Sequence, residues 1–251
     1  MSSVNTAASY SLGIALSGGG FRGMAHIGVL GALERHGLKP DFIAGTSAGS
    51  LVGALYASGK SAANIESLAS KIFWPKLLSS RGLADFCRDN LPRTFAELAI
   101  PLSVVVTALP SKALAVLDSG ELAPAIAASC AMPWLLRRIK IENGVYMDGG
   151  CACVLPAKVC RDRGCQTVIS SDVWWRASVA RKSGFTLNSR FAEQVYSCQY
   201  IEAFRKSDLV IHPRIPAAGI VPGRRGMHSL IQSGEAEAEK ALAGWQQVVP
   251  A

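Results

Sequence analysis

A serine flanked by glycines is the first residue in this sequence that could act as a nucleophile. Residues 45–49 read GTSAG and match the pattern G-x-S-x-G, with Ser47 between Gly45 and Gly49. In this pattern the serine lies on a tight strand-to-helix turn, because the small glycines let neighbouring backbone pass close while the hydroxyl points outward. A serine that only caps a helix is the plain alternative. At the start of a helix, negative charge that develops on Ser47 is favoured by the helix dipole.

A second glycine-rich turn, residues 18–23 (GGGFRG), has two interpretations. Gly18, Gly20 and Gly23 fit the G-x-G-x-x-G fingerprint of a dinucleotide site. That site also needs an acidic residue at the carboxyl end of the second strand. Asp41 stands at the amino end instead, and Arg22 has no role in the scheme.

The same turn can instead form an oxyanion hole. Three successive glycines, Gly18, Gly19 and Gly20, present backbone N–H groups that can stabilise a transient negative charge. Both glycine turns follow strands of one predicted parallel sheet, so they emerge at the same sheet edge, where ligands of open α/β sheets bind. The nucleophile and the oxyanion donors can therefore meet.

A nucleophilic serine needs a base, and two arrangements are open. In the usual hydrolase order, an acid (Asp148 or Asp172) and then a histidine (His212 or His228) follow the serine. Both histidines also have structural explanations, at a strand end and at a helix start. Asp148 follows an apolar strand and precedes two glycines, so its carboxylate could act directly as the base if burial raised its pKa. A carboxylate that only closes a turn remains the alternative.

The elements that must hold these residues alternate between strands and helices. Apolar runs at 12–16 and 42–44 predict buried strands, and each leads through a glycine turn into a helix, the first ending at residue 37 and the second at residue 59. This order is typical of an α/β fold, in which helices cover both faces of a mostly parallel sheet.

The rest of the chain continues the alternation. Further strands are predicted at 102–108, 113–117, 139–141, 145–147, 168–173 and 209–212, and further helices at 65–73, 122–130, within 187–206 and at 227–245. The pair Asn143 and Gly144 predicts a hairpin turn. Residues 74–98 are the least regular region, a candidate lid or insertion. Because no repeat or low-complexity linker divides the sequence, we expect one domain over residues 1–251.

Four blocks in this order resemble the patatin-like phospholipases. They are residues 18–23 (GGGFRG), 45–49 (GTSAG), 128–133 (ASCAMP) and 148–150 (DGG), and the likeness continues to about residue 173. The resemblance implies a three-layer α/β/α fold with a mostly parallel central sheet. It also implies a serine–aspartate dyad without histidine, and Ser17, where plant members carry aspartate, looks like the bacterial variant.

The resemblance assigns roles residue by residue. It implies Ser47 as nucleophile, Asp148 as base, Gly18, Gly19 and Gly20 as oxyanion donors, and Arg22, Gly45, Gly49 and Gly149 as supporting residues. The expected reaction is hydrolysis of an ester in a phospholipid or lysophospholipid, without a cofactor. Two alternatives are an esterase with a histidine-containing triad and a nucleotide-binding module that uses residues 18–23.

The composition limits the class of protein and its partners. The 251 residues are 49% hydrophobic and 18% charged, which excludes disordered, collagenous and coiled-coil chains. No run of 18 apolar residues and no basic-then-apolar leader is present, so we expect a cytoplasmic protein. A net charge of +8 makes the protein attractive to negatively charged partners. Anionic lipid or a small anion is a suitable partner of this kind. No nucleic-acid motif accompanies the charge, and no nucleic-acid partner is expected.

Cysteines and aromatic residues raise two further questions. Four of the seven cysteines cluster in sequence (Cys151, Cys153, Cys160 and Cys165), but without a C-x-x-C pair or nearby histidines we expect reduced core thiols and no metal. Two aromatic and basic segments, 71–78 (KIFWPKLL) and 174–176 (WWR), predict peripheral contact with a membrane, with core or lid packing of the tryptophans as the alternative.

Overall fold

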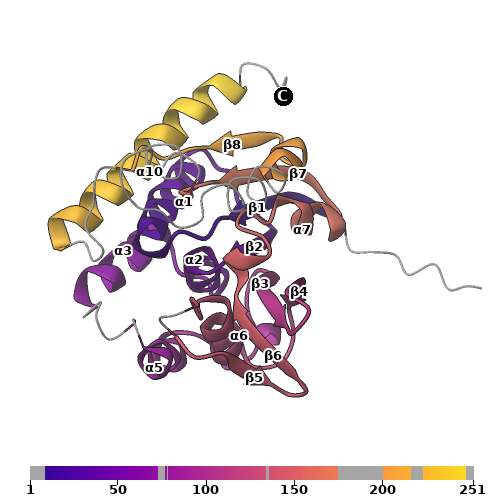
Figure 1. The fold of residues 1–251 in the computed structure, drawn as a ribbon. Coiled ribbons are helices and arrows are strands. Elements are labelled where there is room, and N and C mark those ends of the chain that lie inside the picture. The colour runs from indigo at the N-terminus through magenta and orange to yellow at the C-terminus, as the bar shows by residue number, and fades with distance from the viewer. Residues whose placement is uncertain are drawn as a thin grey trace, which may run out of the picture.

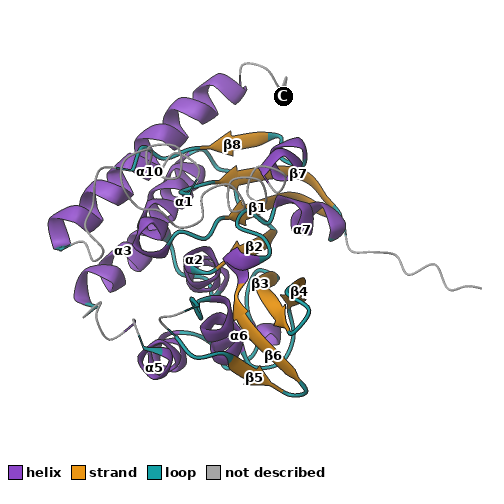
Figure 2. Ribbon diagram, viewed as in Figure 1, coloured by secondary structure: helices purple, strands orange, loops and turns teal. Residues whose placement is uncertain are grey.

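The computed structural model describes residues 9–72, 77, 79–133, 136–174, 200–215 and 223–246. Within them, a central eight-stranded sheet carries helices on both faces (Figures 1 and 2). The strands are β1 (Tyr10–Leu16), β2 (Phe42–Thr46), β3 (Leu102–Leu109), β4 (Ala113–Leu117), β5 (Ile139–Ile141), β6 (Gly144–Asp148), β7 (Cys165–Ser171) and β8 (Leu209–Ile211). The helices are α1 (Met24–Arg35), α2 (Ala48–Ala57), α3 (Ala62–Lys71), α5 (Ser80–Asn90), α6 (Leu122–Ser129), α7 (Ala157–Asp162) and α10 (Arg224–Gln246), with short 3₁₀ turns at Gly20–Gly23, Phe95–Glu97 and Gly149–Cys151.

The sheet has a parallel part and an antiparallel part. Its strand order is β5-β6-β3-β2-β1-β7-β8, and β4 also pairs with β3. The strands from β3 to β8 along this order are parallel to one another, whereas β4 and β6 run antiparallel to β3, and β5 antiparallel to β6. The predicted mostly parallel sheet is therefore confirmed.

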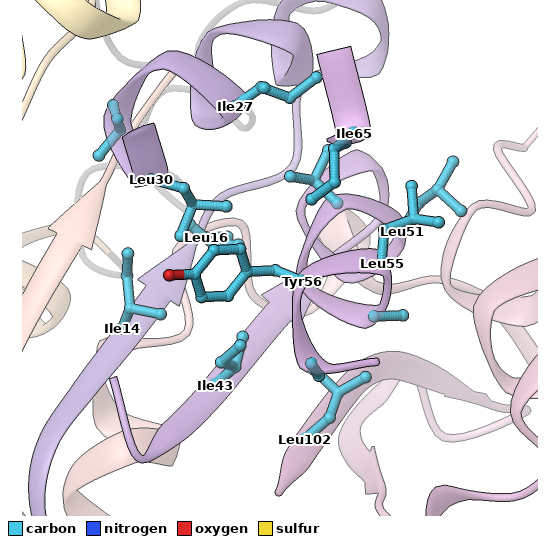
Figure 3. Packing of buried hydrophobic residues seen from close by; sticks show 14 of the residues in the cluster. Ile14, Leu16, Ile27, Leu30, Ile43, Leu51, Leu55, Tyr56, Ile65 and Leu102 are labelled. Carbon is cyan, nitrogen blue, oxygen red and sulfur yellow. The ribbon is translucent and has the colours of Figure 1, made fainter. Parts of the chain in front are cut away.

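Alternation along the strands divides the core into two clusters, one on each face. Ile14 and Leu16 of β1 belong to the cluster under α1, α2 and α10, whereas Ala15 between them belongs to the cluster under α7. This is the two-residue period of a strand that is buried on both faces. Figure 3 shows Ile14 and Leu16 among side chains of the neighbouring helices, and Figure 1 shows α7 on the opposite side of the sheet from α1.

The expectation that residues 74–98 are irregular is wrong over much of their length. Residues 80–90 form α5, which begins after Ser79, whose side chain accepts a hydrogen bond from the Gly82 N–H at 3.0 Å. Leu83 and Cys87 are buried one helical turn apart, which fixes this amphipathic helix on the core. Residues 74–76 and 78 of the suggested lid lie outside the described part of the chain.

Several boundaries also differ from the prediction. The hairpin loop is Glu142 and Asn143, with Gly144 already paired to Ile141, so the predicted turn is wrong by one residue. The helix α7 was not predicted, because its six residues are too few to show a clear period. Residues 187–199 of another predicted helix lie outside the described residues.

Among the described helices, none is long and apolar enough to cross a bilayer.

Candidate active site

The turn between β2 and α2 holds Ser47 in a conformation that side chains rarely adopt. Ser47 precedes the first residue of α2 and has φ 51° and ψ −122°, a positive φ that is costly for a residue other than glycine. A Cβ on Gly49 would lie 2.3 Å from the Leu16 carbonyl oxygen, and one on Gly45 would lie 2.6 Å from the Gly49 carbonyl oxygen. The flanking glycines therefore let α2 start directly against the ends of β1 and β2.

The side chain of Asp148 meets the hydroxyl of Ser47. The Ser47 hydroxyl donates to Oδ2 of Asp148 at 2.9 Å, while Oδ1 accepts from the Gly150 N–H at 2.8 Å. Asp148 is 6% exposed, and burial raises the pKa of its carboxyl to about 6, although the hydrogen bonds from Gly150 and Ser47 oppose this rise. A carboxylate with this pKa can accept a proton near neutral pH.

The long strand β3 brings these two residues together. Thr46, the last residue of β2, pairs with Val105, and Asp148, the last residue of β6, pairs with Val106. Because β4 covers the other edge of β3 from residue 104 to 108, β2 and β6 lie on the same edge and end head to head. A Cβ on Gly149 would lie 2.2 Å from the Val105 carbonyl oxygen, so the chain leaves β6 across the surface of β3.

The glycine turn at residues 18–20 lies against Ser47. A Cβ on Gly18 would lie 3.5 Å from the Ser47 Cβ. The Gly18 N–H donates to the Val154 carbonyl at 2.9 Å and is therefore already used. The N–H groups of Gly19 and Gly20 have no hydrogen-bond partner among the described residues, and a Cβ on Gly20 would meet nothing within 4 Å. Gly18 is therefore not available as an oxyanion donor, and Gly19 and Gly20 remain as the candidates.

Arg22 extends the glycine turn toward the segment that follows β7. Its guanidinium carbon lies 5.4 Å from the centre of the Trp174 ring, within the range of a cation–π contact. Trp174 is thus packed against the turn. Of the other aromatic and basic residues predicted to contact a membrane, Lys71 is the exposed last residue of α3, whereas those at 73–76, 78, 175 and 176 lie outside the residues that the structure describes.

The histidines and the acidic residue that the alternative sites would need have other partners. His212 Nδ1 lies 3.4 Å from Oδ2 of Asp172, and the exposed His228 lies 3.3 Å from Glu66 of α3. The hydroxyl of Ser47 donates to a carboxylate rather than to either imidazole. Asp41 accepts from the N–H groups at the start of β1, at the opposite end of the strand from the glycine turn. Neither the triad nor the dinucleotide arrangement is therefore assembled.

Three polar residues of the site were not singled out from the sequence. Ser129 bonds to the backbone of Ser47, and Thr107 donates to the carbonyl oxygen of Asp148 at 2.7 Å. His26 lies fully buried under the glycine turn, 2.9 Å from the Ser17 carbonyl oxygen, and burial lowers its pKa to about 4. Only Ser129 carried a signal, since it falls in the block at residues 128–133; a buried histidine on an apolar helix face carries none.

The described residues contain no group of three or more histidine, cysteine or acidic side chains that could hold a metal ion. The four cysteines that cluster in sequence differ in burial: Cys160 and Cys165 are buried, Cys153 is half-buried and Cys151 is exposed. All four are free thiols.

The family model described as "Patatin-like phospholipase" matches residues 14–161, which contain both glycine turns, Ser47 and Asp148. The chain belongs to this family. The human "Patatin-like phospholipase domain-containing protein 6" is 33% identical over 184 residues, and "Lysophospholipase NTE1" of Saccharomyces cerevisiae is 31% identical over 182. Each alignment covers 65% of this chain but only 13% and 11% of those much longer relatives.

Solved structures agree with the fold of this family member. VipD of Legionella pneumophila superposes with a TM-score of 0.64 at 14% identity, covering 94% of this chain and 67% of VipD. ExoU, in its heterodimeric complex with SpcU of Pseudomonas aeruginosa, superposes with a TM-score of 0.59 at 17% identity, covering 94% of this chain and 52% of that one. At such low identity these matches show that the α/β architecture is shared.

Proposed function

We propose that this member of the patatin-like phospholipase family hydrolyses carboxylic esters of phospholipids or lysophospholipids with a dyad of Ser47 and Asp148. One observation carries the proposal: the Ser47 hydroxyl donates at 2.9 Å to a buried carboxylate whose pKa is raised to about 6. A base of this pKa is ionised at neutral pH and can still take a proton in the transition state. The names of the relatives support the lipid substrate.

In the first half of the reaction, the Ser47 oxygen bonds to the ester carbonyl carbon while its proton passes to Oδ2 of Asp148. The carbonyl oxygen becomes an oxyanion, which the free N–H groups of Gly19 and Gly20 stabilise. When the tetrahedral intermediate collapses, the ester bond breaks, and the departing alcohol takes the proton from Asp148. The acyl group is then bound to Ser47.

In the second half, water replaces the alcohol. Asp148 takes a proton from the water as the resulting hydroxide bonds to the acyl carbon, and the same N–H groups hold the second oxyanion. Collapse of this intermediate breaks the bond to the Ser47 oxygen, which recovers its proton from Asp148. A carboxylic acid leaves, and the enzyme returns to its starting state.

The proposal is tested with Ser47→Ala and Asp148→Asn, each assayed on a short p-nitrophenyl ester and on vesicles of phospholipid and lysophospholipid. Each substitution should lower kcat by about 10³-fold or more, because it removes the nucleophile or its base. A fluorophosphonate probe should label the wild-type protein on the peptide that contains Ser47. Unchanged turnover in either folded variant would refute the dyad.

The controls separate this dyad from the alternatives. His212→Ala and His228→Ala should keep most of the activity, whereas a triad would lose it. Ser70→Ala, on the exposed face of α3, controls for loss of a serine far from the site. If the chain binds nucleotides through residues 18–23 instead, Ser47→Ala should leave nucleotide-dependent thermal stabilisation intact. With vesicles, anionic lipid should raise activity, because the chain carries a charge of +8.

A further inference from the structure

The edge of β3 that carries both strand ends has a gap in its hydrogen bonding. β2 leaves β3 after Val105 and β6 leaves it at Val106, so at this point neither strand continues along β3. A buried backbone group at such a junction needs another partner, because an unpaired polar group inside a protein is costly. The junction also lies directly beside Ser47 and Asp148.

The hydroxyl of Ser129 fills this gap. Ser129 is the last residue of α6, which packs against β3 and β6, and it is completely buried. Figure 1 shows α6 beside β3. The Ser129 hydroxyl donates to the Val105 carbonyl at 2.6 Å and accepts from the Ser47 N–H at 2.8 Å. Because a hydroxyl has a single hydrogen, donation to Val105 leaves a lone pair for the Ser47 amide.

The next residues of the same segment reach the other half of the site. Two residues after Ser129, the carbonyl of Ala131 accepts from the Asp148 N–H at 3.0 Å. One three-residue segment thus bonds to the backbone amides of both proposed catalytic residues. Its geometry sets the separation of the two amides, and with it the approach of hydroxyl to carboxylate.

We propose that Ser129 is a positioning residue, which holds the Ser47 amide so that the serine keeps its positive φ and directs its hydroxyl at Asp148. This inference rests on the proposed function. A positive φ in a residue other than glycine persists only where the surroundings impose it. The bond from the Ser47 amide to Ser129 is one such constraint, and no strand can replace it at this point of the sheet.

Ser129→Ala and Ser129→Cys test the inference. Alanine removes the hydroxyl, and cysteine keeps a similar shape with a weak donor and acceptor. Both should lower kcat by about 10- to 100-fold with KM within about twofold, because small displacements of reacting groups have effects of this size. Ser129→Thr keeps the hydroxyl, so its log kcat should lie at least halfway from that of Ser129→Ala back to that of the wild type. If Ser129→Ala is unstable at the assay temperature, the cysteine variant carries the same prediction.

Ser103→Ala is the matched control. Ser103 is also completely buried and also lies on β3, and its hydroxyl has no hydrogen-bond partner among the described residues. Its kcat should equal that of the wild type. If Ser129→Ala and Ser129→Cys keep wild-type kcat, or if both change KM and kcat equally, the positioning role is refuted.

The same set of proteins separates this result from failure of the proposed function. If Ser47→Ala retains the activity, the dyad is refuted and Ser129 has no catalytic serine to position. If Ser47→Ala and Asp148→Asn are inactive while Ser129→Ala is normal, the dyad stands and only the positioning role fails.

Discussion

The turns that carry Ser47 and Asp148 meet at one point but are built differently. The turn at Ser47 joins a parallel strand to a helix within residues 42–57, and its shape depends on the glycines two residues before and after the serine. The turn at Asp148 ends a short antiparallel strand, which returns along β3 after a helix and a hairpin. The first turn is formed mainly by residues close in sequence, with one hydrogen bond from the Ser47 amide to Ser129 of α6, whereas the second turn depends on β3 and α6 lying in register.

This difference predicts where each half of the site is sensitive to change. Close backbone packing against the end of β1 shapes the serine turn, in addition to the hydrogen bond from the Ser47 amide to Ser129, so a single added methyl group should disrupt it. Hydrogen bonds from distant residues fix the aspartate turn, so their removal should cost less and act one bond at a time. The Asp148 carboxylate is an exception to this small effect, because burying its negative charge lowers the stability of the folded protein.

The largest effect is expected for Gly49→Ala. Its Cβ would lie 2.3 Å from a backbone oxygen of Leu16, which cannot move aside, so we expect a loss of stability of about 3 kcal/mol and almost complete loss of activity. Thermal unfolding and ester hydrolysis measure the two. Gly244→Ala on α10 is the matched control, because a Cβ there meets nothing within 4 Å and alanine favours a helix. Equal stability of the two variants would contradict a turn fixed by packing.

Asp148→Asn should stabilise the protein above pH 6 while it abolishes activity. The folded-state pKa of about 6 lies above the ordinary value of 3.8, so ionisation of Asp148 removes stability as pH rises from about 4 to 6. Asparagine avoids this loss, and we expect a gain of about 2 kcal/mol, or about 4 to 8 °C in Tm, at pH 8.

The same ionisation should act on activity with the opposite sign. The wild-type kcat/KM should rise as pH passes through about 6, because the base must be ionised. His26, with a pKa lowered to about 4, loses its contribution to stability as pH falls from 6.5 to 4, but it does so in both proteins. The difference in Tm between wild type and Asp148→Asn therefore reports Asp148. A difference independent of pH from 4 to 8 would refute the raised pKa.

The smallest effect is expected for Thr107→Val. This change removes the 2.7 Å hydrogen bond to the Asp148 carbonyl and keeps the shape of the side chain, so we expect a loss of about 1 kcal/mol and a modest fall in kcat. Thr167→Val on β7 is the control, in a strand away from the site. Denaturant unfolding gives the free energies. If Thr107→Val destabilised the protein as much as Gly49→Ala, the proposed contrast between the two turns would be lost.

Much of the fold was predictable from local patterns. The apolar runs of β1 and β2, each followed by a glycine turn and a helix, gave the parallel part of the sheet, because strands buried on both faces have continuous apolar sequences. The helix α5 was missed because its sequence is mostly polar, and its apolar face consists of Leu83, Phe86 and Cys87 alone, which is too short a pattern to stand out. Its burial against α6 decides its position, and that contact cannot be read from the segment alone.

The candidate site was predictable in part. The order of four blocks singled out Ser47 and Asp148 as candidates before their contact was known. It did not distinguish Gly18 from Gly19 and Gly20, because whether an amide is free depends on the distant carbonyl of Val154. It also gave no role to Ser129, whose two partners lie on β3 and at the end of β2.

The sequence by itself therefore determined which residue types are present and the local turns that suit them: a serine between glycines, a glycine run after a strand, an aspartate at a strand end. Steric and hydrogen-bonding preferences of neighbouring residues are sufficient for these. The tertiary structure alone decided that the hydroxyl and the carboxylate are in contact, which amides remain free, and that burial raises the pKa of Asp148. Distance, hydrogen-bond pairing and desolvation arise between segments far apart in the chain, and they exist only once β2 and β6 have met on β3.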